Sequence, residues 1–290
     1  MKFSIPTSFL EPTQFVEMAK AADEAGFWSM AISDHIVHPE KIESEYPYAP
    51  DGKPYWPSSN PWPDPFVTIA AMAAVTERLR FFTNVFILPA RNPFLVAKQV
   101  STAAVLSRNR VALGIGVGWM REEFELLEQE FTTRGKRTNE AIEILRLLWS
   151  GGMVEYHGAH YDFDRLEMAP APSEQIPIYC GGLSKPALRR AAGLCDGWIN
   201  VVHTLDELKA YVAQLTELRC EYGRENEPFE IVGASGEVFD LDGYRRLGDV
   251  GVTSTMVIPW MLYEDVDGTC VQGRCDAIRR FGDDVISKIG

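Results

Sequence analysis

The amino-acid sequence predicts a (β/α)₈ barrel, and three observations favour this fold class. Eight strand-like segments alternate with helix-like segments along the chain. Two of the strands, residues 81–88 and 111–118, are apolar on both faces, as buried parallel strands are. The length of 290 residues fits one barrel, which needs about 250 residues. We therefore expect one domain over residues 1–290.

The first half of the chain is expected to hold four strand–helix units. The predicted strands are residues 2–9, 29–34, 81–88 and 111–118, and the predicted helices are residues 12–25, 64–77 and 93–106. Pro12 near the first turn and Gly26 just past the end bound the first helix. Two helical pieces follow within residues 121–150, because the helical spacing of apolar residues breaks near residues 132–135.

The second half is expected to supply the remaining strands and two insertions. The predicted strands are residues 176–180, 197–202, 229–236 and 254–259, and the predicted helices are residues 185–193 and 205–222. A loop over residues 35–62, with six prolines and no periodicity, follows the second strand. Residues 154–168 are expected to form a small hairpin before the fifth strand.

A doubly wound sheet is the alternative architecture. Its fingerprint, G-x-G-x-x-G, follows the first strand and is accompanied by an acid about 20 residues further on. Here Gly114, Gly116 and Gly118 lie two residues apart in the fourth strand, so the barrel is favoured. Glycines at this spacing would bare the backbone on one face of the strand, where a flat or bulky ligand could approach.

Composition limits the classes of function. The net charge of −13 argues against a nucleic-acid-binding surface, which needs clustered Lys and Arg. No apolar run approaches the roughly 18 residues of a membrane span, and no signal peptide precedes the first strand, so we expect a soluble cytoplasmic protein without membrane contact. The five cysteines are scattered and the histidines are not grouped at metal spacing, and we therefore expect no metal.

The active site of a barrel lies at the C-terminal ends of its strands, where Asp34 and His35 follow the second strand. Imidazole titrates near neutrality, and a neighbouring carboxylate can hold its charge and tautomer. Adjacent strand residues point in opposite directions, so both can face one ligand only if the strand is already turning. The structural alternative is that Asp34 caps the loop and His35 is an ordinary loop residue. We expect a functional His35.

A glycine turn after the fifth strand is a candidate phosphate site. The segment is Gly181-Gly182-Leu183-Ser184, and the following helix carries Lys185, Arg189 and Arg190. Free amides, a helix N-terminus and local positive charge suit a phosphate. The common alternative is a glycine turn with a serine N-cap.

The long loop over residues 35–62 is rich in aromatic side chains. It holds Tyr46, Tyr48, Tyr55, Trp56 and, as its last residue, Trp62. Loops longer than about 12 to 15 residues are usually functional or disordered. We expect a lid over a flat ligand, and the alternative is a proline-stiffened surface loop that covers the barrel rim.

Many ordered segments resemble the bacterial luciferase-like flavin and deazaflavin oxidoreductases. These segments are residues 26–35, 64–66, 83–93, 98–99, 106–110, 114–119, 123–124, 177–178, 181–182 and 196–198. The match extends over nearly the whole chain. The resemblance implies a TIM barrel that binds coenzyme F420, or alternatively FMN, at the strand ends and that is usually a homodimer.

The resemblance also implies roles for individual residues. His35 would be the acid/base beside the ring of the coenzyme, and Asp34 would lie at the pyrimidine end of the ring. Asn84-Val85 would form a non-proline cis peptide behind the ring. The remaining residues expected to bind the cofactor are Thr83, Gly116, Val117 and Gly118 along the ring, and Gly181, Gly182, Leu183 and Ser184 at the phosphate.

Trp119 departs from part of the family pattern, because the sugar-phosphate dehydrogenases of the family carry a catalytic glutamate at this position. We expect Trp119 in the site, the loss of proton delivery by a carboxylate there, and an apolar or aromatic substrate. The function that this implies is hydride transfer between coenzyme F420 and a small organic molecule. The alternatives are an FMN-dependent monooxygenase and a flavin-binding protein without turnover.

Overall fold

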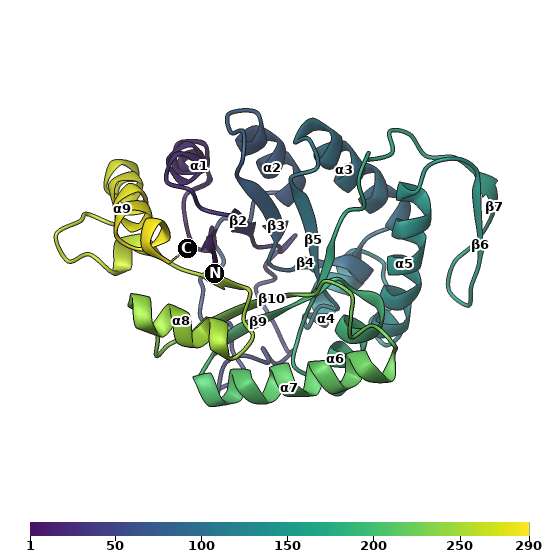
Figure 1. The fold of residues 1–290 in the computed structure, drawn as a ribbon. Coiled ribbons are helices and arrows are strands. Elements are labelled where there is room, and N and C mark those ends of the chain that lie inside the picture. Colours follow the sequence, from purple (N-terminus) through teal and green to yellow (C-terminus); the bar gives the residue numbers. More distant parts are fainter. Residues whose placement is uncertain (290) are drawn as a thin grey trace.

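The computed structural model describes residues 1–289 and confirms the (β/α)₈ barrel (Figure 1). Eight parallel strands follow one another around a ring that closes where β11 pairs with β1. They are β1 (Lys2–Pro6), β2 (Ser29–Ile32), β3 (Arg80–Thr83), β5 (Val111–Gly116), β8 (Ile178–Gly181), β9 (Gly197–His203), β10 (Glu230–Ser235) and β11 (Ser254–Met256). A short strand β4 (Phe86–Ile87) follows β3 and also pairs with β5.

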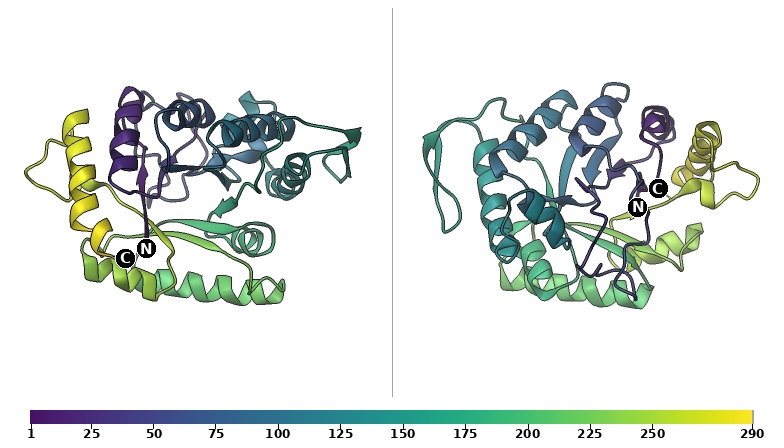
Figure 2. Two further views of the ribbon diagram at one scale, coloured as in Figure 1. Left: turned by 45° about the horizontal axis from the view of Figure 1, so that its top comes forward. Right: turned by 180° about the vertical axis from the view of Figure 1, so that it is seen from behind.

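Helices surround the ring of strands (Figures 1 and 2). They are α1 (Phe15–Glu24), α2 (Pro65–Ala73), α3 (Pro93–Leu106), α5 (Arg134–Trp149), α6 (Lys185–Leu194), α7 (Leu205–Glu221), α8 (Leu241–Asp249) and α9 (Val271–Asp284), with the short α4 (Arg121–Leu126) after β5. Four 3₁₀ turns complete the elements: η1 (Pro12–Gln14), η2 (Leu88–Ala90), η3 (Pro259–Met261) and η4 (Ile286–Lys288). The two ends of the chain lie close together beside β1 (Figure 1).

Local caps explain where several helices begin. The Asp64 side chain accepts hydrogen bonds from two N–H groups of the first turn of α2, and Asn92 does the same for Phe94 in α3. A proline occupies the first position of both helices, where its missing N–H costs nothing. The helix predicted over residues 93–106 is therefore confirmed at both ends.

Apolar side chains fill two layers of the fold. Inside the barrel lie apolar residues of five strands: Ala31, Phe82, Ala112, Ile199 and Val232. A larger core joins the outer face of the strands to the helices, and Ile5, Met30 and Leu113 are fully buried in it. Strands that are covered on both faces read as continuous apolar runs, which is why the sequence pattern indicated a parallel sheet.

Both predicted insertions form. Residues 154–168 contain the antiparallel hairpin of β6 (Val154–His157) and β7 (Asp162–Leu166), which stands out at the edge of the molecule (Figure 1).

The predicted strand over residues 81–88 is divided, because a cis peptide between Asn84 and Val85 separates β3 from β4. The helix expected over residues 64–77 ends at Ala73, and the strand expected over residues 254–259 ends at Met256.

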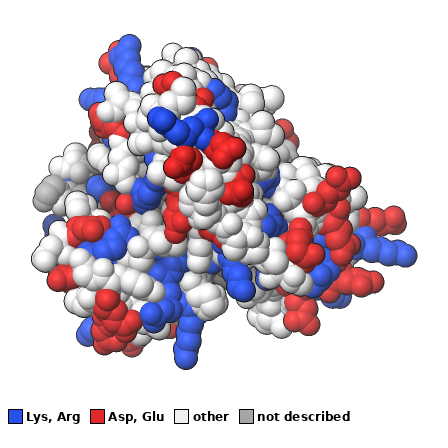
Figure 3. Space-filling view, turned by 90° about the vertical axis from the view of Figure 1, so that its right-hand side faces the viewer, with Lys and Arg blue, Asp and Glu red and all other residues white. Residues whose placement is uncertain are grey.

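Charges are mixed over the surface. On the face that carries α5 and the hairpin, Lys and Arg side chains alternate with Asp and Glu side chains (Figure 3). Within residues 1–289, none of the helices is long and apolar enough to pass through a lipid bilayer.

Candidate active site

His35 lies just beyond the C-terminal end of β2 and pairs with a carboxylate from α4. Its Nδ1 is 3.3 Å from Oε2 of Glu123, whose side chain is fully buried. The other carboxylate oxygen of Glu123 accepts hydrogen bonds from the backbone N–H groups of Ile36 (2.6 Å) and Val37 (3.5 Å). Burial alone raises the pKa of Glu123, but the bonds from His35 and the two N–H groups outweigh it and hold the pKa below its usual range. The carboxylate is therefore ionised at neutral pH.

Asp34 does not partner His35, which corrects the prediction. Its buried carboxylate receives two hydrogen bonds from the Arg91 guanidinium (2.7 and 2.8 Å) and one from the Ile87 N–H (3.0 Å). Burial raises the pKa of Asp34, and the charge of Arg91 acts against this rise. With its side chain 1% exposed, Asp34 joins β2 to the segment after β4, and we withdraw its roles as a catalytic and cofactor-contacting residue.

Aromatic rings surround His35 on several sides. The ring centroids of Trp62, Trp56 and Trp119 lie 5.4, 5.7 and 6.1 Å from that of His35. Tyr46 connects two of these indoles, at 4.9 Å from Trp56 and 5.1 Å from Trp119. Trp119 and the aromatic loop thus meet at the imidazole, although Trp119 lies 57 positions beyond Trp62 in the chain.

The loop over residues 35–62 lies across the end of the barrel and is fixed to α4. It crosses the side of the molecule seen in the right panel of Figure 2. Beyond the contacts of Glu123, the Glu122 carboxylate accepts hydrogen bonds from the N–H groups of Glu43 and Ser44, and the Ser44 hydroxyl accepts one from the N–H of Arg121. Two adjacent glutamates therefore hold the loop over His35.

Val85, the second residue of the cis peptide, packs against glycines of two neighbouring strands. A Cβ at Gly116 would lie 2.7 Å from one Val85 methyl group, and a Cβ at Gly181 would lie 2.9 Å from the other. The cis peptide that the resemblance implied is confirmed. Val85, Gly116 and Val117 stay partly exposed at this end of the barrel.

The space beside Gly114, Gly116 and Gly118 is filled by neighbouring atoms, which corrects the prediction of a bared strand face. The Thr83 carbonyl oxygen lies only 1.9 Å from where a Gly114 Cβ would be. At Gly118, the side chains of Phe124 and Ile87 fill the space that a Cβ would need. Thr83 itself is fully buried, and its hydroxyl donates a hydrogen bond to the Gly114 carbonyl (2.7 Å). It supports the barrel wall, and we withdraw it as a cofactor contact.

The turn after β8 has the backbone form expected of an anion site, but fewer cations lie beside it than the sequence predicted. Gly182 has φ +110°, which favours glycine, and its carbonyl accepts a hydrogen bond from the Trp198 indole. Ser184 caps α6 through the Ala187 N–H. Leu183 is partly buried. The cations of α6 are mostly directed elsewhere, because Arg190 is buried against Asn139 and Arg189 pairs with Glu221, which leaves Lys185 exposed beside the turn.

Comparisons with known proteins agree with this geometry. A family model described as luciferase-like monooxygenase matches residues 4–239, well over half of the chain. The chain belongs to this family of oxidoreductases.

Similar proteins include a full-length relative. An uncharacterised protein of Mycobacterium tuberculosis is 41% identical over 292 residues and matches 100% of both chains. An F420-dependent glucose-6-phosphate dehydrogenase of Nakamurella multipartita is 30% identical over 243 residues, which are 82% of this chain and 67% of that protein. The solved coenzyme F420-dependent tetrahydromethanopterin reductase of Methanopyrus kandleri has the same fold, with a TM-score of 0.76, 15% identity and coverage of 100% and 99%.

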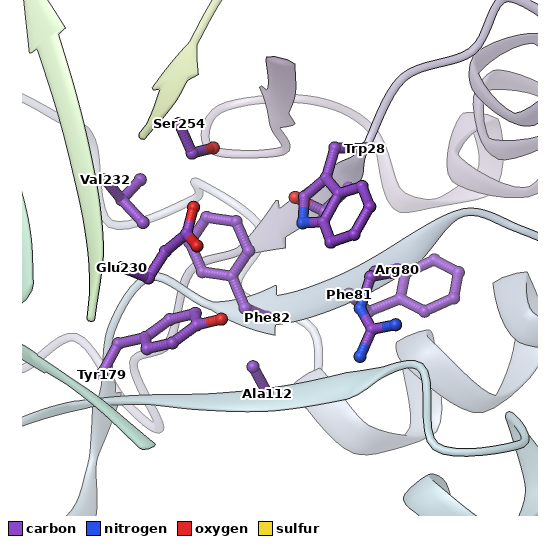
Figure 4. Close-up of a pocket in the computed structure, with 10 residues that line it drawn as sticks. Trp28, Arg80, Phe81, Phe82, Ala112, Tyr179, Glu230, Val232 and Ser254 are labelled. Carbon is purple, nitrogen blue, oxygen red and sulfur yellow. The ribbon is translucent and has the colours of Figure 1, made fainter. Parts of the chain in front are cut away.

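A small cavity of this luciferase-like barrel lies at the opposite end, where the strands begin (Figure 4). Trp28, Phe82, Tyr179 and Glu230 line it. Glu230 forms an ion pair with Lys2 (2.7 Å), and burial together with this carboxylate raises the pKa of Tyr179. The N-terminal end of barrel strands serves stability, and His35 lies at the other end.

Glu123, which pairs with His35, is the residue of the candidate site that the sequence did not single out. Glu123-Phe124 was one of the segments carrying the family resemblance, but its position on a short helix gave it no role. No pattern in the sequence distinguished Glu123 from its neighbours Glu122 and Glu125. Among residues 1–289, no group of three or more His, Cys, Asp and Glu side chains is placed to hold a metal ion.

Proposed function

We propose that the protein transfers a hydride between coenzyme F420 and a small apolar or aromatic organic substrate. One observation carries this proposal. The buried His35–Glu123 pair, the apolar surface of Val85 and three indoles all lie at the C-terminal end of one barrel. The Nakamurella and Methanopyrus proteins, both named for F420 dependence, support the choice of coenzyme.

The residues at this end fit a coenzyme with a flat ring and a phosphate. Val85 offers an apolar surface held by Gly116 and Gly181, while Gly181–Ser184 and the start of α6 offer amide groups and Lys185. The residues that would contact the coenzyme are Asn84, Val85, Gly116, Val117, Gly118 and Gly181–Ser184. When bound, the coenzyme supplies or accepts the hydride at C5 of its ring, which the protein has no group to do.

His35 would exchange the proton that accompanies the hydride, since its imidazole lies inside the aromatic cluster and imidazole is the commonest acid/base group of enzymes. Trp56, Trp62 and Trp119 would exclude water and contact a flat substrate. An open groove at the surface reaches Trp119 of this cluster. Its other lining residues are Lys41, Glu43, Ser44, Glu45, Arg121, Glu122, Glu125 and Phe131. Without a carboxylate at position 119, the site favours apolar substrates over sugar phosphates.

Cofactor titration tests the proposal against the alternative of an FMN-dependent monooxygenase, which the family description supports. The purified protein would be titrated separately with F420 and FMN, and the absorbance and fluorescence of each would report binding. We expect binding of F420 at micromolar concentration or below and weaker binding of FMN. Tight FMN binding with no affinity for F420 would overturn the choice of coenzyme.

A homodimer is part of the same proposal. Helices α2 and α3 contact each other and expose Val67 (72%), Leu95 (66%) and Leu106 (66%). Helices that are apolar on most sides are usually buried, so this exposed face suits a second copy of the chain. Light scattering after size exclusion should give twice the 32.5 kDa chain mass, and Val67→Glu should give the monomer mass.

A further inference from the structure

The two carboxylate oxygens of Glu123 have different partners. Oε1 faces two backbone donors, the N–H groups of Ile36 and Val37. Oε2 faces Nδ1 of His35. Because the side chain is fully buried, water does not compete for either oxygen.

An ionised carboxylate only accepts hydrogen bonds, so its neighbour Nδ1 must carry the proton. In the neutral ring, Nε2 then keeps its lone pair. We propose that Glu123 is a positioning residue that holds His35 in its Nδ1–H tautomer and leaves Nε2 to exchange the proton of the reaction. The tautomer follows from the contact of Nδ1 with a buried, ionised carboxylate, and only the role of Nε2 rests on the proposed function.

The other groups around His35 do not set its tautomer. Asp34, next in the chain, is bonded to Arg91 from the segment after β4. Tyr46 of the loop lies in the same cluster, and burial raises the pKa of its phenol, which therefore stays neutral. Trp56, Trp62 and Trp119 are uncharged. The carboxylate that meets the imidazole comes from α4.

Glu123→Gln distinguishes the proposed positioning role from a purely structural role of Glu123 as an anchor of the loop. A purely structural role would leave the tautomer of His35 unchanged. Glutamine has nearly the same shape and one carbonyl oxygen. The N–H groups of Ile36 and Val37 require that oxygen at the Oε1 position, so the amide NH₂ must face Nδ1 of His35. A donor there forces Nδ1 to accept, and the ring must take the Nε2–H tautomer. The loop stays anchored while the tautomer inverts.

Nitrogen NMR of the cofactor-free, full-length protein with ¹⁵N-labelled histidine reads the tautomer directly. Spectra would be recorded at alkaline pH, where imidazole is neutral. The His35 signals are assigned by their absence in His35→Gln. We expect Nδ1–H in the wild type and Nε2–H in Glu123→Gln, while Glu122→Gln, a matched change on the neighbouring residue, keeps the wild-type pattern.

Two results would overturn the proposal: an Nε2–H tautomer in the wild type, or the same tautomer in wild type and Glu123→Gln. If Glu123→Gln does not fold, the wild-type spectrum alone decides. With F420 and a substrate, kcat of Glu123→Gln should fall about 100-fold with little change in KM, since acid/base catalysis contributes at least about that factor. If the tautomer inverts in Glu123→Gln but the wild-type protein with F420 acts on no substrate, the proposed function is contradicted and the positioning of His35 by Glu123 still holds.

Discussion

Oε2 of Glu123 lies 3.3 Å from Nδ1 of His35, although 88 positions separate the two residues in the chain. The carboxylate adjacent to His35 in sequence, Asp34, is bonded to Arg91 instead. The imidazole is thus held by the helix after β5 and covered by the loop after β2. This arrangement gives the site a proton-exchanging group in an enclosed aromatic environment.

Replacement of His35 should separate catalysis from binding. In His35→Ala, kcat should fall by about 10² to 10⁴-fold, the usual contribution of an acid/base residue, while F420 still binds. Steady-state kinetics and a fluorescence titration measure the two effects. His157→Ala, which changes an exposed histidine of the hairpin, is the control. Cofactor binding with unchanged reduction of every substrate would favour catalysis without His35.

Loss of the Asp34 charge should destabilise the protein. Asp34→Asn leaves the largely buried guanidinium of Arg91 without its counterion, which should lower the free energy of unfolding by about 3 kcal/mol. Urea titrations followed by circular dichroism measure this difference. The double variant Asp34→Asn/Arg91→Met should recover most of the loss, because no unpaired charge remains. An unchanged unfolding midpoint in Asp34→Asn would contradict a structural ion pair.

A methyl group at Gly116 should disturb the surface on which the coenzyme ring is proposed to rest. Its Cβ would lie 2.7 Å from a methyl group of Val85, so Val85 must move. We expect Gly116→Ala to raise the Kd for F420 at least about 10-fold, through overpacking that costs about 1–3 kcal/mol. Gly135→Ala is the control, because its new Cβ would have its nearest neighbour at 3.6 Å. Equal affinities in both variants would argue against a coenzyme ring that rests on Val85.

Asp23 should give a pH-dependent contribution to stability. Burial raises its pKa, but hydrogen bonds from the N–H groups of Glu77, Leu79 and Arg78 outweigh this and lower the pKa below its usual value. A lowered pKa in the folded state stabilises the protein above the unfolded pKa of about 3.9, and the benefit is lost as the pH falls through the folded value.

Asp23→Ala should therefore lower the free energy of unfolding by about 1–2 kcal/mol at pH 7 and by less below pH 3. Urea titrations at the two pH values test this. Glu17→Ala, an exposed change on the same helix, should alter stability by at most about 0.5 kcal/mol at either pH. A loss of equal size at both pH values in Asp23→Ala would rule out the charged form as its cause.

The outer contact of the loop should control its opening. Glu122→Ala removes the acceptor for the N–H groups of Glu43 and Ser44. Trypsin should then cleave after Lys41, which precedes Ile42, several times faster than in the wild type, since proteolysis follows the population of the open form. Glu125→Ala, on the exposed side of the same helix, should leave the cleavage rate unchanged. Equal rates in both variants would mean that Glu122 does not hold the loop.

The class of fold was determined by local sequence patterns. Apolar runs at β3 and β5, the alternation of strands with amphipathic helices, and caps such as Asn92 before Pro93 all act between residues that are close in the chain. The position of His35 at the end of β2 followed from the same alternation, because barrel strands present their C-terminal ends at one face.

The partners of the site residues were decided only by tertiary structure. Whether a buried carboxylate meets an imidazole or a guanidinium depends on which segments the closed barrel brings together. Asp34 meets Arg91, and Glu123 takes the place beside His35 that chain proximity suggested for Asp34. The same holds for Gly114, Gly116 and Gly118, whose missing side chains make room for Thr83, Val85 and Phe124 respectively. Periodicity encodes which face of an element is buried, but the atoms that fill that face come from segments far away in the sequence.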